Sequence, residues 1–190
     1  MIKRYNATKD NTITNAFDST LVTRGVSSSM GQADILENFA IYGQVSSSDG
    51  FSKEEARILV AFDLSIQADI SNKVVPASSS YYLRLFNAEH GNTNPVDFNL
   101  EVYSLSASWQ EGYGLDMDNY SDLSYGVGSN WIKRSGSVSW TAEGGDVHAG
   151  TASVQTFSTG LEDLNIDVTT QVQSWLDGRT NNGFMIRLPT

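Results

Sequence analysis

The stretch from Leu164 to Leu188 constrains the fold most, because it holds the clearest helical signal of the chain between two strand signals. Four apolar residues recur at the spacing that places them on one face of a helix: Val168, Val172, Trp175 and Leu176. Four polar residues are predicted to face water: Thr169, Gln171, Gln173 and Asp177. A helix with one apolar face must pack on an apolar surface, so we expect it to cover an open end or side of a sheet.

The ends of this helix are also predicted locally. Asp167 stands where its carboxylate can accept amide hydrogens of the first turn, and Gly178 follows the last periodic residue as a left-handed stop. The turn formers Arg179 to Gly183 come next, and the alternation of apolar residues from Phe184 to Leu188 then predicts a half-buried strand.

The rest of the chain contains short strand signals separated by glycine-rich and serine-rich links. Ala56 to Leu64 is apolar on both alternating faces, which predicts a central strand covered on both sides. The polar segment Gly43–Lys53, before that strand, is predicted as a loop. After it, the spacing of Tyr81–Phe86 and Phe98–Leu105 favours an antiparallel ribbon between these two segments. Further strands are expected at Thr12–Phe17, Ile35–Tyr42 and Val154–Phe157. This pattern predicts an all-β protein, an antiparallel β-sandwich of jelly-roll type with one short helix near the C-terminus.

Length and composition limit the class of protein further. A chain of 190 residues suits a single domain spanning 1–190, with 1–11 as an extended N-terminal arm. The absence of cysteine excludes disulfides and thiolate metal sites. The net charge of -10 disfavours nucleic acid and anionic membranes as partners. No segment has the roughly 20 apolar residues of a membrane span, and we expect no signal peptide because no apolar region follows the charged start.

The polar, aromatic-rich segment from Ser108 to Trp140 is the first candidate for a binding site, because long loops in compact domains tend to carry function. Its aromatic rings could stack on sugars or anchor a protein interface. Trp131, Trp140 and Trp175 could instead fill the core. The candidate ligand-binding residues are Trp109, Tyr113, Tyr120 and Trp131.

An acidic run inside this segment is the candidate metal site. Asp116, Asp118 and Asp122 place carboxylates at a density that suits a hard cation such as calcium, although the run lacks the glycine and the distal glutamate of an EF-hand loop. A solvated acidic loop is the alternative. No other cofactor is predicted.

Catalytic residues are not evident. The two histidines, His90 and His148, lie in glycine-containing segments without a serine or aspartate motif beside them, which indicates surface histidines. Glu54 and Glu55 are adjacent and therefore unsuited to flank a glycosidic bond from opposite sides, so we expect solvated charges at a strand end. The sequence thus predicts a protein that is not an enzyme.

Several motifs together resemble one family. They are KDNTITNAF, EEARILVAFDLS, YYLRLFNAE, FNLEVYSLSASWQEG, NWIKRSGSVSWTAEGGD and DVTTQVQSWLDGRTNNGFMIRL, in this order across nearly the whole chain. The chain resembles the DNRLRE-type jelly-roll domain related to carbohydrate-binding modules. With GQADILENFAIYGQ and EGYGLDMDNYSDL it looks most like the version found in virion proteins of marine tailed bacteriophages.

This resemblance implies a non-enzymatic virion protein, assembled in the bacterial cytoplasm as a capsid decoration, neck or tail component. Its expected partners are other virion proteins, including copies of itself, and host surface polysaccharide. Domains of this family usually add a strand after the position of Leu188, so we expect an unpaired edge there that a neighbouring chain could fill. The alternative is a carbohydrate-binding module or surface adhesin without a virion role, and a glycan hydrolase is a third, weaker hypothesis.

Overall fold

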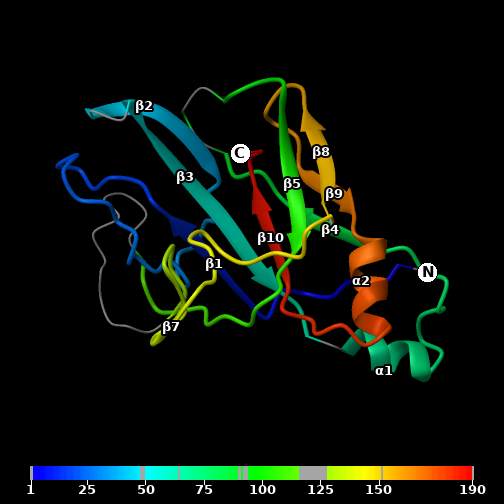
Figure 1. Cartoon of the computed structure of the whole chain (residues 1–190). Coiled ribbons are helices and arrows are strands. Elements are labelled where there is room, and N and C mark those ends of the chain that lie inside the picture. The colour runs from blue at the N-terminus through cyan, green and yellow to red at the C-terminus, as the bar shows by residue number, and fades with distance from the viewer. Residues whose placement is uncertain are drawn as a thin grey trace.

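A computed structural model describes residues 2–47, 50–63, 65–89, 91, 94–115, 128–150 and 152–189, without the side chains of 44–47, 50 and 51. It contains ten strands and two helices among these residues (Figure 1). The strands are β1 (Lys9–Thr14), β2 (Phe39–Ser47), β3 (Gly50–Ala61), β4 (Tyr82–Leu85), β5 (Phe98–Ser104), β6 (Lys133–Ser135), β7 (Val138–Ser139), β8 (Ser153–Phe157), β9 (Leu164–Asp167) and β10 (Phe184–Arg187). The helices are α1 (Ser65–Ser71) and α2 (Thr169–Leu176).

The main layer is an antiparallel sheet in the order β1-β3-β10-β5-β8, with β2 paired to the first half of β3. Strands β4 and β9 form a second, two-stranded sheet, and β6 and β7 form a small hairpin. The chain leaves the large sheet for the small one and returns to it twice, from β3 through β4 to β5 and from β8 through β9 to β10. The antiparallel β-sandwich predicted from the sequence is therefore confirmed.

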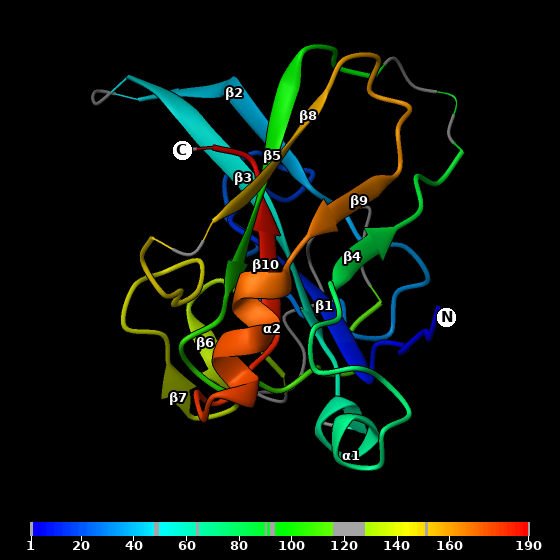
Figure 2. The same cartoon turned by 90° about the vertical axis from the view of Figure 1, so that its right-hand side faces the viewer.

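The first core lies between the large sheet and the layer made by β4, β9 and α2 (Figure 2). Val172 and Trp175 of α2 belong to the same buried cluster as Ile58 and Val60 of β3, and the Trp175 ring lies 4.7 Å from the ring of Phe184 in β10. The helix thus packs against a sheet, as its apolar face predicts. Its ends are also confirmed, because Oδ1 of Asp167 accepts the Thr169 amide at 2.8 Å and Gly178 has φ 106°.

A second core fills part of the opposite face of the large sheet. Leu59 of β3 and Met185 of β10 are fully buried there under the loops that surround β6 and β7. The remaining buried members are Ile13, Ala61, Leu105, Trp109, Trp131 and Trp140. Strand β3 is therefore buried on both faces, as its two apolar sets predict.

Several boundaries and partners differ from the predictions. Within the predicted loop Gly43–Lys53, residues 43–47 are the end of β2 and residues 50–53 the start of β3, because backbone pairing overrides the serine-rich composition. Strands β4 and β5 do not pair with each other; β4 pairs with β9, while β5 pairs with β8 and β10. The turn-rich link between them is thus a crossover between layers, and the predicted ribbon is wrong.

Four smaller findings concern local segments. Helix α1 was not predicted, because no pattern of apolar residues indicates a helix over residues 65–71. The first strand begins at Lys9 instead of Thr12, and the arm before it is held by Tyr5, which packs against the first core. Gln171, predicted to face water, is buried, and its side-chain amide donates to Oγ of Ser153 at 3.0 Å. Strand β10 has neighbours on both sides, so it is not an edge strand.

Candidate functional site

Two of the predicted ligand-binding aromatics are buried in the second core. Trp109 is only 4% exposed; its Nε1 donates to the carbonyl of Asn182 at 2.9 Å, and the ammonium of Lys9 lies 4.3 Å from a ring centroid. Trp131 is 5% exposed and stacks with the guanidinium of Arg57 at 4.6 Å. Neither ring offers a free face, so the geometry does not support sugar stacking by these two residues.

The other predicted site residues divide into two groups. Tyr113 is 67% exposed, which leaves it available to a ligand. Tyr120 and the candidate calcium ligands Asp116, Asp118 and Asp122 lie outside the described residues, so their predicted roles stay predictions. Within the described ranges no group of three or more histidine, aspartate or glutamate side chains is placed to hold a metal ion.

The adjacent acids Glu54 and Glu55 are buried in β3, and the prediction that they are solvated strand-end charges is wrong. Glu54 accepts the amide of Phe17 at 2.9 Å. Glu55 lies 2.8 Å from the Arg57 guanidinium and 2.6 Å from the Lys53 ammonium. Burial opposes the charged form of Glu55, but hydrogen bonds from these two cations outweigh it and keep the pKa below its usual value.

These acids therefore have a structural role. Burial lowers the pKa of Arg57, and the ion pair with Glu55 opposes that shift, so the buried cation depends on its partner. The Arg57 guanidinium also donates to the Gly144 carbonyl at 2.8 Å, which ties a loop of the second core to the sheet.

A polar groove of about 520 Å³ lies beside the buried Trp109. Nη1 of Arg134 donates to the carbonyl and hydroxyl of Ser108 at 2.8 and 3.0 Å, and Asp146 accepts the amides of Thr141 and Ala142. Hydroxyl, amide, guanidinium and carboxylate groups thus line one open depression. The lining residues are Ser106, Ala107, Ser108, Arg134, Val138, Ser139, Thr141, Asp146, Thr180 and Asn182. No sequence pattern predicts that these segments lie together.

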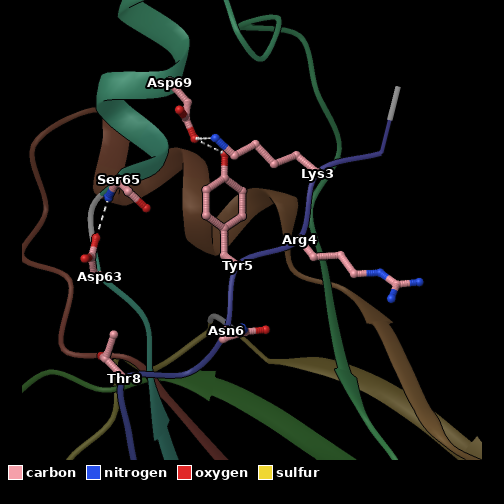
Figure 3. A pocket seen from close by; sticks show the side chains of 8 residues that line it. All are labelled: Lys3, Arg4, Tyr5, Asn6, Thr8, Asp63, Ser65 and Asp69. Carbon is pink, nitrogen blue, oxygen red and sulfur yellow. Dashed lines mark hydrogen bonds and ion pairs between the residues drawn. The ribbon is translucent and has the colours of Figure 1, made fainter.

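A smaller pocket of about 300 Å³ separates the N-terminal arm from α1 (Figure 3). Asp69 of α1 forms an ion pair with Lys3 and accepts the Tyr5 hydroxyl at 2.7 Å. Arg4 points away from this group in Figure 3. The charges at the centre of the pocket are thus already paired, and the contacts fasten the arm to the helix.

Exposed side chains gather on the outer face of β4 and just beyond the small sheet, and we call them the β4 strip: Tyr82 and Arg84 of β4, Phe86 directly after it, and Leu161 before β9. Tyr82 is 60% exposed, Phe86 72% and Leu161 69%. Arg84 stacks on Phe86 at 4.8 Å and lies 3.6 Å from the Asp163 carboxylate.

Two hydrogen bonds join the end of β4 to the segment before β9. Asn87, next to Phe86, donates its backbone amide to the Asp163 carboxylate at 3.0 Å and its side-chain amide to the Gly160 carbonyl at 3.1 Å. These contacts connect the residues on either side of Leu161 to the end of β4.

Part of the opposite face of the large sheet carries paired charges and two tyrosines, and we call it the charged face: Tyr42, Lys53, Glu101, Tyr103 and Arg187, with the buried Glu55 paired to Lys53. Arg187 lies 3.2 Å from Glu101 and 4.6 Å from the Tyr103 ring, and Lys53 lies 6.0 Å from the Tyr42 ring. These residues come from four neighbouring strands, β2, β3, β10 and β5, and each cation is paired with a carboxylate on the same side of the sheet.

No protein-family model, curated protein or solved structure matches this chain. Neither helix in the described part of the chain has the length and apolar character that crossing a bilayer requires.

Proposed function

We propose that this chain is a non-enzymatic structural domain of a tailed-phage virion, where it makes protein-protein assembly contacts as a capsid decoration, neck or tail component. The motif resemblance supports the virion setting. The β4 strip supports the assembly role, and it is the observation on which the proposal rests.

The strip has the composition of an interface centre. Tyrosine, phenylalanine and arginine are enriched at protein interfaces, and exposed aromatic side chains that stand together need a partner more than scattered ones do. Tyr82 and Arg84 flank the buried Leu83 in β4 and therefore point outward, and Phe86, directly after the strand, is 72% exposed. A partner can therefore cover them without any change in the fold.

The proposal is tested on particles. Antibodies against the chain should label purified virions, and a tagged chain expressed during infection should co-purify with them. The variant Tyr82→Ser/Phe86→Ser should fold normally but be lost from particles, because both substituted side chains are exposed. The matched control Val22→Ser removes another exposed apolar side chain, from a different loop, and should be retained. Absence of the native chain from particles would refute the virion role.

The polar groove favours a second candidate, binding of a surface polysaccharide. Its hydroxyl and amide groups suit a polyhydroxylated ligand, and Tyr113 supplies an exposed ring elsewhere in the aromatic-rich half. Calorimetry with bacterial surface polysaccharide should then give saturable binding that Arg134→Ala or Tyr113→Ala weakens about tenfold. No heat of binding, or binding unchanged in both variants, would argue against this candidate.

A further inference from the structure

The link between α2 and β10 contains the one Asn-Gly pair in the sequence, Asn182–Gly183. An asparagine followed by glycine is especially prone to deamidation, because glycine has no side chain to hinder attack by its own backbone nitrogen. In this reaction the Gly183 nitrogen loses its proton and bonds to Cγ of Asn182, and the bond from Cγ to Nδ2 breaks to release ammonia. Water then opens the succinimide ring and leaves either aspartate or isoaspartate at position 182. In sum, an amide and water become a carboxylic acid and ammonia.

The native fold holds the attacking nitrogen in other contacts. The Gly183 N–H donates to Oδ1 of Asn181 at 3.0 Å, and the Gly183 carbonyl accepts the Leu105 amide at 2.9 Å. A Cβ on Gly183 would lie 2.3 Å from the carbonyl oxygen of Val60, so this residue is buried tightly between β3 and the end of β5. A succinimide nitrogen carries no hydrogen. Ring formation therefore removes the bond to Asn181 and disturbs a backbone that has no room to move.

Asn182 itself is held through its backbone and its side chain. Its carbonyl accepts Nε1 of Trp109 at 2.9 Å, and its side-chain amide lies 3.4 Å from the Leu105 carbonyl oxygen. Succinimide formation joins Cγ to the Gly183 nitrogen, so the contact with Leu105 is lost. Asn182 also lines the polar groove, where water can reach it. Protection of this residue must therefore come from the fixed backbone and not from exclusion of water.

We infer that Asn182 is a deamidation site which the native fold keeps closed and which reacts when the link before β10 opens locally. The reaction cannot be reversed by refolding, because ammonia has left. In the isoaspartate product the main chain runs through Cβ and Cγ, so it is longer by a methylene group next to the tightly packed Gly183. The former backbone carbonyl, which accepts the Trp109 N–H, becomes a free carboxylate. The modification thus records that this link has opened.

The test follows deamidation of the full chain by peptide mass spectrometry in mildly alkaline buffer, with and without urea. In urea, Asn182 should react faster than the other asparagines of the chain. Without urea, its rate should fall at least about tenfold, because only the locally opened fraction of the chain reacts. A folded chain that deamidates at Asn182 as fast as the chain in urea would overturn the inference.

Two variants separate local opening from global unfolding. Asn181→Ala removes the acceptor of the Gly183 N–H and should raise the rate in the folded chain about fivefold, the effect of losing one hydrogen bond. Ile166→Val is the matched control, since it removes one methyl group from the first core and lowers global stability by a similar amount. It should leave the rate unchanged. All three chains should react equally in urea, and circular dichroism checks that each folds without it.

The outcomes of the comparison are distinct. Faster deamidation in Asn181→Ala alone supports local opening of the link. Equal acceleration in both variants would show that only global unfolding exposes the site, and a native rate in Asn181→Ala would show that the hydrogen bond to Gly183 does not protect it. Either result would overturn the inference.

Discussion

Replacement of Trp109 by alanine separates a core role from a ligand-stacking role. The indole is 4% exposed, and burial of a tryptophan removes about 150–250 Å² from water. At about 25 cal/mol per Å² this area corresponds to about 4–6 kcal/mol, close to the roughly 3–5 kcal/mol that aromatic-to-alanine changes cost in cores. The lost hydrogen bond to Asn182 adds about 1 kcal/mol. We therefore expect Trp109→Ala to lower the free energy of unfolding by about 4 kcal/mol.

The assay is urea unfolding followed by tryptophan fluorescence and circular dichroism at neutral pH. Tyr113→Ala is the matched control, since its ring is 67% exposed and its loss should change stability by no more than about 0.5 kcal/mol. Trp109→Phe should fall between the two, because it keeps a ring but loses the N–H donor. If Trp109→Ala cost less than about 1 kcal/mol, the loop layer would not be a packed core and the reasoning would fail.

Three further predictions concern single groups. The backbone amide of Thr159 donates to the Glu162 carboxylate and holds its pKa at about 2, below the unfolded value of about 4.3. The ionised carboxylate therefore stabilises the folded state above pH ~4.3, and this contribution is lost toward pH 2. The melting temperatures of the native chain and Glu162→Gln should differ at neutral pH and converge in acid. Burial and the hydrogen bond to Asp69 raise the pKa of Tyr5 to about 12. The neutral Tyr5 hydroxyl therefore stabilises the folded state below pH ~10, and this contribution is lost between about pH 10 and 12. Asp69→Asn should lower the pKa of Tyr5 in an ultraviolet titration. Gly183 has φ 87°, and a Cβ there would stand 2.3 Å from a backbone oxygen of β3, so Gly183→Ala should cost at least about 2 kcal/mol in urea unfolding.

The C-terminal unit was predictable because its determinants are local. Asp167 caps the first turn, Gly178 ends the helix and the apolar face falls on one side, all within a dozen residues. The pairing of β4 was not predictable in the same way. Its partner β9 lies about eighty residues away, and its neighbour in sequence, β5, belongs to the other layer. Strand partners are chosen by packing of whole layers, which spacing along the chain does not encode.

Helix α1 shows the same limit at short range. It has seven residues and a single buried side chain, Ile66, with no acidic residue in its first turn. Seven residues are too few for a helix to be stable alone, so contacts with the N-terminal arm must help to hold it. The ion pair between Lys3 and Asp69 joins residues far apart in sequence, and no local pattern indicates it.

The aromatic-rich half of the chain shows why composition alone could not locate a binding surface. A loop layer between β5 and β8 must be anchored, and tryptophan supplies a large apolar surface together with one N–H group that needs an acceptor. Trp109 and Trp140 both donate to backbone carbonyls, at 2.9 and 2.8 Å, so their polar atoms are satisfied inside the second core. These rings hold the loops to the sheet and are not available to a partner. Exposed aromatic side chains on or next to strands are instead Tyr42 of β2, Tyr82 of β4 and Phe86, which directly follows β4, and the last two stand together beside the small sheet. Recognition by this protein is therefore best sought on the outer face of the small sheet, away from the segment richest in aromatic residues.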